Sequence, residues 1–139
     1  QGNKQLARYK RLVMVYPGGK EPVGQLQGYE QFCAQYGWQP QVLKSIEGQK
    51  IIPGTAYIVP NDADLVYLVK HARGHKLRIG HDIGIISYNE HPLKEVVANG
   101  ITTISTDFHA MGQTLAQMVL NREKGRFRNP ASLHLRQSL

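Results

Sequence analysis

The sequence predicts an α/β domain in which helices cover both faces of a mostly parallel sheet. Short apolar segments rich in β-branched residues alternate with segments whose apolar residues recur at helical spacing, along nearly all of the 139 residues. Parallel strands need a crossover between them, and right-handed crossovers place helices above and below the sheet. The length is that of one domain, so a single folding unit is expected.

The first strand is predicted at "RLVMVY", residues 11–16, where the apolar run stops at a Pro-Gly-Gly turn. A helix is predicted over residues 22–36. Pro22 suits a first helical turn, and Gly37 suits the left-handed position just past the last turn. A second strand is predicted at residues 41–46.

A loop is predicted at residues 47–54, and the third strand follows at "TAYIVP", residues 55–60. The next apolar stripe has helical spacing. Asn61 or Asp62 is placed to cap the first turn of this helix, and Gly74 is placed to stop it.

The remaining elements follow the same alternation. We expect a fourth strand at residues 82–88, a short helix at 92–98, a fifth strand at 101–106, a helix at 110–120 and an edge strand at 132–138. The inner side of the last helix is predicted to carry Met111, Leu115, Met118 and Val119.

The composition excludes several classes of function. The formal net charge is +7, and the basic residues form two clusters, Lys4, Arg8, Lys10 and Arg11 near the start and Arg122, Lys124, Arg126 and Arg128 near the end. Neither cluster is interleaved with aromatic residues as in proteins that bind single-stranded nucleic acid, so a solvated basic surface is expected. Cys33 is the only cysteine, which excludes an internal disulfide and a cysteine-based zinc site. No apolar run is long enough to span a membrane and no signal segment opens the chain, so a cytoplasmic location is expected.

Metal binding and catalysis are not expected. His71, His75 and His81 have no acidic ligand at a recognisable spacing. Ser87 lacks a Gly-x-Ser-x-Gly context, and Cys33 is predicted to face the core. The sequence therefore predicts neither a metal ion, nor a cofactor, nor an enzymatic activity.

Polar side chains follow two of the predicted strands. Asn61 and Asp62 come after one strand, and Tyr88, Asn89 and Glu90 come at the end of the next. Ligands of parallel α/β sheets bind beyond the carboxyl ends of the strands. Amide, carboxylate and aromatic groups together suit a polyhydroxylated small molecule. The alternative is that these residues cap a helix, form a turn and face solvent.

The order and spacing of these segments resemble a known family. "DIGIISYNEHPLKEVVANGITTISTDFHAMGQTLAQMVL", residues 82–120, followed by "NPASLHLRQSL", is similar to the C-terminal lobe of the effector-binding domain of LacI/GalR transcriptional regulators. The resemblance also takes in "RLVMVY", "GQLQGYEQFCAQYG" and "AYIVPNDADLVYLV". It therefore covers nearly the whole chain.

The resemblance implies one lobe of a periplasmic-binding-protein-like (type I) fold at residues 11–139, with residues 1–10 as a leader or a connection between lobes. It also implies a second lobe and a DNA-binding head that this chain lacks. The implied partners are a sugar or sugar phosphate effector, DNA through the head, and a second copy in a homodimer. The implied mechanism is allosteric control of DNA binding, with no membrane partner.

The same resemblance implies eight ligand-binding residues: Gln25, Asn61, Asp62, Tyr88, Asn89, Glu90, Thr106 and Phe108. Two of them depart from the family pattern, because Gln25 stands where an arginine is typical and Asn89 where an aspartate is common. Both departures favour a ligand that differs from the usual effectors of the family or is more neutral than they are. A third departure is the loop at residues 47–54, where the family usually has a helix.

Three alternatives stay open at this point. A transport receptor for sugars shares the fold but is exported. The effector domain can also be fused to a GntR-type winged-helix head. A nucleotide-dependent enzyme would instead place its ligand at a glycine-rich first turn.

Overall fold

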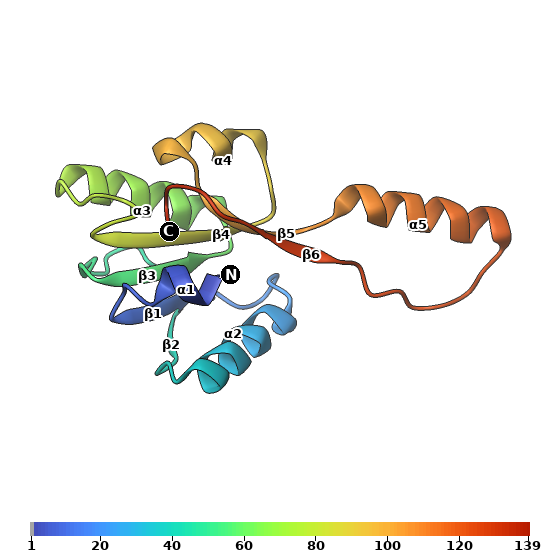
Figure 1. Cartoon of the computed structure of the whole chain (residues 1–139), viewed down its shortest axis with the longest axis horizontal. Helices are drawn as coiled ribbons and strands as arrows, with labels where there is room; N and C mark the ends of the chain where they lie inside the picture. Colours follow the sequence, from blue (N-terminus) through green and yellow to red (C-terminus); the bar gives the residue numbers. More distant parts are fainter. Residues whose placement is uncertain (1) are drawn as a thin grey trace.

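The computed structural model describes residues 2–139 and contains one six-stranded sheet with the strand order β2-β1-β3-β4-β5-β6 (Figure 1). The first five strands are parallel and β6 runs antiparallel to β5. The strands are β1 (Arg11–Val15), β2 (Gln41–Leu43), β3 (Thr55–Val59), β4 (Ile83–Tyr88), β5 (Thr102–Thr106) and β6 (Ala131–His134). The helices are α1 (Gly2–Leu6), α2 (Val23–Tyr36), α3 (Asp62–Gly74), α4 (Pro92–Val96), the 3-10 turn η1 (Val97–Asn99) and α5 (Phe108–Asn121).

The predicted fold class is confirmed, and so is the edge position of the last strand. Three details differ from the prediction. The short helix α1 was not expected, β2 has only three residues, and the last strand ends at His134 although it was predicted to reach residue 138. The segment 47–54 carries no helix or strand, as predicted, and its Ile51 and the preceding Ile46 are buried against the sheet. Apolar side chains from a loop therefore cover part of the face that a helix would otherwise cover.

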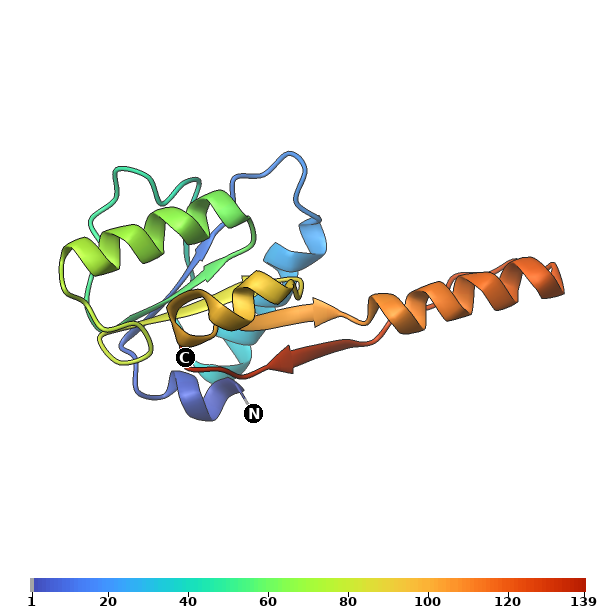
Figure 2. The same ribbon diagram turned by 90° about the horizontal axis from the view of Figure 1, so that it is seen from above.

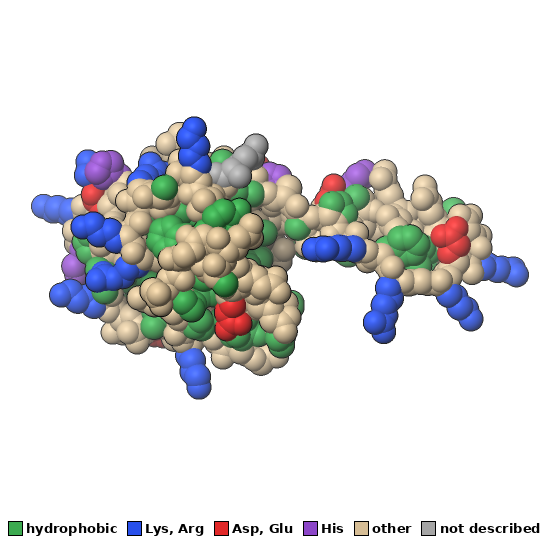
Figure 3. Space-filling view, turned by 60° about the horizontal axis from the view of Figure 1, so that its bottom comes forward, with side chains coloured by type: hydrophobic (Ala, Val, Ile, Leu, Met, Phe, Trp, Pro, Cys, Tyr) green, Lys and Arg blue, Asp and Glu red, His purple; other side chains and the backbone are tan. Residues whose placement is uncertain are grey.

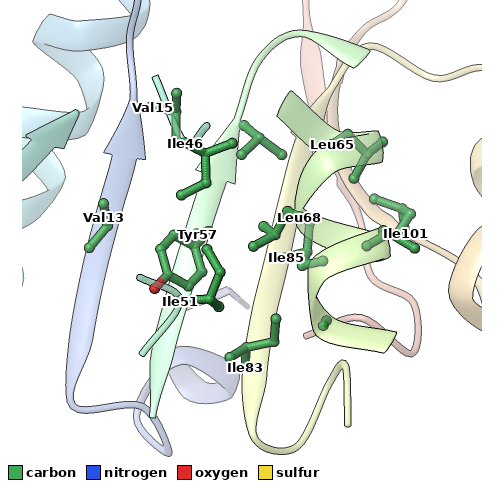
Figure 4. Close-up of a cluster of buried hydrophobic side chains, with 13 residues drawn as sticks. Val13, Val15, Ile46, Ile51, Tyr57, Leu65, Leu68, Ile83, Ile85 and Ile101 are labelled. Atoms are coloured by element: carbon green, nitrogen blue, oxygen red, sulfur yellow. The ribbon is translucent and has the colours of Figure 1, made fainter. Parts of the chain in front are cut away.

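One face of the sheet packs against α3. The side chains on this face alternate along each strand, as the period of two in a pleated strand requires, and they meet the inner side of α3 (Figure 4). Leu68 and Ala72 of α3 are fully buried in this cluster. The cluster also contains Val13, Val15, Tyr57, Val59, Ile83, Ile85 and Ile101.

The other face packs against α1 and α2. Tyr29 and Cys33 of α2 meet the alternate strand residues, together with Leu6 and Tyr9 near the start of the chain. The Tyr9 ring lies so close to Gly84 of β4 that a Cβ at residue 84 would be 2.8 Å from it. Cys33 is 1% exposed, which confirms that it is a core residue.

Residues 136–139 run back beside β4 and β5. Ser138 makes four hydrogen bonds. Its hydroxyl donates to the Ile85 carbonyl and accepts from the Thr102 amide, both at 2.7 Å, its carbonyl accepts from the Ile85 amide at 2.7 Å, and its amide donates to the Gly100 carbonyl at 3.1 Å. Leu139 is 5% exposed. This segment is therefore fixed in the core of the fold.

The prediction of an inner side on the last helix is wrong. None of the residues of α5 is buried, and Leu115 and Val119 are 54% and 76% exposed. Figures 1 and 2 show the reason: α5 and the returning chain extend away from the sheet, so that no other element covers the helix. The space-filling view shows apolar and basic side chains together on this arm (Figure 3).

Candidate functional site

The carboxyl ends of the parallel strands lie at one edge of the sheet, which we call the rim. β1 lies between β2 and β3 in the sheet. The chain leaves β1 toward β2 on one side and then crosses back to β3 on the other side, so the strand order reverses at β1. Ligands of open α/β sheets bind next to such a switch in direction. The segments that follow β1, β3, β4 and β5 begin at Tyr16, Pro60, Asn89 and Asp107.

Asn61 is the N-cap of α3. Its side-chain oxygen accepts a hydrogen bond from the Asp64 amide at 2.8 Å, and its side-chain nitrogen donates to the Asp64 carboxylate at 2.5 Å. The Asp64 carboxylate also accepts from the Ile46 amide. Both ends of the Asn61 amide are therefore occupied, as the capping alternative predicted.

Asp62 is paired with a lysine that the sequence analysis did not select. The Lys94 Nζ lies 3.0 Å from the Asp62 carboxylate, and it donates to the carbonyls of Tyr88 and Asn89 at 2.7 and 3.1 Å. Asp62 is largely exposed, whereas the Lys94 side chain is 8% exposed. Lys94 thus brings the end of β3 next to the end of β4.

Asn89 has a fixed backbone and an unengaged side chain. Its φ angle is +61°, in the left-handed region, which asparagine tolerates better than most residues. Its amide donates to the Ile104 carbonyl at 2.8 Å, and its own carbonyl accepts from Lys94. Its side chain is exposed and makes no hydrogen bond to residues 2–139.

Glu90 is held inside the protein. Arg136 donates to its two carboxylate oxygens at 2.9 and 2.5 Å, the Thr103 hydroxyl also donates to it, and its amide donates to the Ser105 hydroxyl at 3.0 Å. These hydrogen bonds, those from Arg136 above all, lower the pKa of Glu90 to about 2. The carboxylate is therefore occupied by protein donors.

Tyr88 points to the face of the sheet that carries α2. It packs against the core cluster on that side and lines a cavity of about 370 Å³ together with Phe32, Tyr36, Ile104 and Leu133. Burial raises the pKa of Tyr88 above its usual value. The tyrosine therefore belongs to an apolar hollow near α1 and α2.

The last three predicted residues lie around the rim. Gln25 is in the first turn of α2, and its side-chain oxygen is buried without a partner among the described residues. Thr106 is the last residue of β5 and is half-buried. Phe108 is the first residue of α5 and is 51% exposed.

Two important residues were missed by the sequence analysis, Lys94 and Arg136. Lys94 had no clear local signal, because α4 has only five residues and Lys94 also falls in its last turn, where a basic residue is ordinary. Arg136 had no local signal, since its partner Glu90 is 46 residues away in the sequence.

Within residues 2–139, no group of three or more His, Cys, Asp or Glu side chains could hold a metal ion. Across the same residues, every helix is too short or too polar to cross a bilayer.

The fold is that of an α/β domain with a mostly parallel sheet, and comparison with known proteins gives its family. Residues 7–139 match the family described as periplasmic binding protein-like domain. The chain belongs to this family. It is also 29% identical, over 105 residues, to the lactose operon repressor of Escherichia coli K12. The aligned residues make up 76% of this chain and 28% of the repressor.

Solved structures give the same picture. The structure of the Lac repressor bound to ONPG in its repressed state has a TM-score of 0.74 at 22% identity, covering 99% of this chain and 49% of that one. A LacI family regulator from Mycobacterium smegmatis has a TM-score of 0.73 at 17% identity, covering 99% of this chain and 60% of that one. The predicted resemblance to LacI-family effector-binding domains is confirmed. The chain spans less than two thirds of the length of these relatives.

Proposed function

We propose that this chain is the C-terminal lobe of the effector-binding domain of a transcriptional regulator, and that its rim forms half of a cleft for a sugar or sugar derivative. The relatives named above are described as repressors and regulators of transcription, which supports a sensor without enzymatic activity. On this proposal the regulator works in the cytoplasm.

Asn89 is the observation that carries the proposal. An exposed amide on a fixed, left-handed backbone is a pre-organised donor and acceptor at the end of a central strand. Holding such a group in advance reduces the entropy that ligand binding must overcome. The neighbouring charges are paired internally, Asp62 with Lys94 and Glu90 with Arg136. This pairing favours a neutral sugar over a sugar phosphate.

The exposed helix α5 supports the presence of a second lobe. A 14-residue helix with no buried residue lacks the packing that stabilises most helices in proteins. Its exposed apolar side chains include Leu115, Val119 and Leu120, and Phe127 of the returning chain is also exposed. We propose that the first lobe of the protein covers this arm, and that β5 and β6 are the strands that cross between the lobes.

Allosteric control and dimer formation follow from the same proposal. An effector that contacts both lobes favours the closed cleft by its differential affinity for that state. The Lac repressor is described as a dimer in related structures. In this chain, an apolar groove of about 320 Å³ between α3 and α4 carries exposed Val66 and Leu93. We propose this groove as the homodimer surface.

Asn89→Ala is expected to abolish effector binding, whereas Asn61→Ala is expected to preserve it. Asn89 offers its side chain to a ligand, but the Asn61 side chain serves α3 as a cap. Losing that cap lowers the free energy of unfolding by about 1 kcal/mol. The measurement is the thermal shift of the two-lobed protein with a panel of sugars and sugar phosphates. The proposal fails if no sugar stabilises the protein, or if Asn89→Ala keeps the full shift.

The amides of α5 are expected to exchange rapidly in this chain by itself and slowly in the two-lobed protein. Alone, the helix has only the returning segment 125–130 beside it and no buried residue, and 14 residues are marginal for an isolated helix. Hydrogen exchange measured by mass spectrometry checks this expectation. The internal control is α3, whose buried face should protect it in both proteins. Equal protection of α5 in both would contradict the placement of the first lobe.

A further inference from the structure

Lys94 is the most buried charged side chain near the rim. It extends from the first turn of α4, and as a whole residue it is 6% exposed. A buried ammonium is unfavourable unless it is paired and hydrogen-bonded. Its place in the structure therefore calls for a specific set of partners.

Those partners match the chemistry of an ammonium group. A lysine ammonium has three N–H donors and no acceptor, and the Lys94 Nζ has three acceptors: the Tyr88 carbonyl, the Asn89 carbonyl and the Asp62 carboxylate. The donors are thus all used inside the protein. A lysine in this state is not available to bind the phosphate of a ligand.

Lys94 holds the carbonyl side of the turn after β4. The amides of Asn89 and Glu90 donate to the Ile104 carbonyl and the Ser105 hydroxyl of β5. The carbonyls of Tyr88 and Asn89 have Lys94 as their side-chain donor. These two carbonyls belong to the peptide groups on either side of the Asn89 Cα, whose φ angle is left-handed.

We propose that Lys94 is the positioning residue of the ligand site: it fixes the direction of the Asn89 side chain and ties that turn to Asp62 at the end of β3. Lys94 itself does not touch the ligand. The inference deepens the proposed function, but its structural part holds whether or not the ligand is a sugar. The segments that follow β3 and β4 thereby form one binding surface.

The first test compares Lys94→Met with Lys50→Met by NMR. Methionine keeps the length and apolar stem of lysine, and Lys50 is an exposed lysine of the loop at residues 47–54 that serves as the matched control. In Lys94→Met the ¹³Cα shift of Asn89 should leave its left-handed value, and the Asn89 and Glu90 amides should exchange at least about tenfold faster. Shifts along β3 should stay unchanged in both variants. An unchanged Asn89 in folded Lys94→Met overturns the proposal.

A second variant covers the case in which Lys94→Met does not fold. Asp62→Ala removes one of the three acceptors at a side chain that is 76% exposed, so folding is not threatened. We expect the signals of residues 88–90 to shift and the exchange of Asn89 to rise several-fold. If those signals stay unchanged, Lys94 does not couple the two strand ends.

The ligand arm uses the two-lobed protein and the sugar that gives the largest thermal shift. Lys94→Met should weaken binding by about tenfold or more, as the loss of supporting residues does at other preorganised sites. Lys50→Met should leave binding unchanged. Because Lys94 has no free donor, binding by wild-type protein should depend little on salt. If no sugar binds, the proposed function fails while the NMR result still decides the role of Lys94.

Discussion

Gly80→Ala is expected to lower the free energy of unfolding by at least about 3 kcal/mol, the range reached only by severe steric or polar defects. A Cβ at residue 80 would lie 1.8 Å from the Gln137 carbonyl oxygen, and the φ angle of +83° is itself unfavourable for alanine. Gln137 cannot yield easily. The next residue, Ser138, is held by the three hydrogen bonds to Ile85 and Thr102 described above.

Gly18→Ala is the matched control for this substitution. Gly18 has nearly the same φ angle, +80°, but nothing lies within 4 Å of a Cβ placed there. It should lose only the backbone term of about 1 kcal/mol. Urea denaturation followed by circular dichroism measures both variants. Equal losses for the two would mean that the contact with Gln137 is relieved at no cost.

Arg136→Met is the second large effect, with an expected loss of about 2 to 3 kcal/mol. Removing one partner of a buried ion pair leaves the other charge uncompensated, and here the side chains of Arg136 and Glu90 are only 19% and 26% exposed. Pairing the substitution with Glu90→Gln should recover part of the loss, because the stranded charge is then gone. A double mutant that simply adds the two single losses would contradict a direct interaction.

The same pair predicts a pH dependence of stability. The folded pKa of Glu90 is about 2, below its ordinary value near 4.5. A depressed pKa contributes stability that is present above pH 4.5 and is lost as the pH falls toward 2. Arg136→Met should therefore lose less stability in this window than the unaltered protein does. Asp82, whose pKa is lowered by Arg78, titrates in both proteins and provides the common background.

The elements of the fold were largely predictable because their signals are local. Gly37 takes the left-handed position after α2, and Asn61 caps α3, as the residue types suggested. The error on α5 has a physical cause. An apolar helical stripe predicts that a helix face will be buried, but it does not identify the covering element. Within residues 2–139 only the returning segment 125–130 lies beside this face, and it buries none of the helix residues.

The candidate site was harder to predict, since its contacts join residues far apart in the sequence. The segment at residues 88–90 was correctly selected as a polar strand end, but the sequence alone does not show that its three side chains have different surroundings. In the structure Glu90 is bound by Arg136, Tyr88 faces an apolar cavity, and the Asn89 side chain stays exposed. Their division of roles depends on Lys94 and Arg136, whose partners no spacing rule indicates.

The antiparallel strands β5 and β6 connect the α5 arm to the rest of the sheet. Thr103, near the start of β5, and Arg136, just past the end of β6, both bind the Glu90 carboxylate. The two strands that carry the arm are thus fastened to one side chain, adjacent to Asn89. If the proposed first lobe pulls on the arm, these two contacts carry the force to Glu90, which is next to Asn89 in the chain.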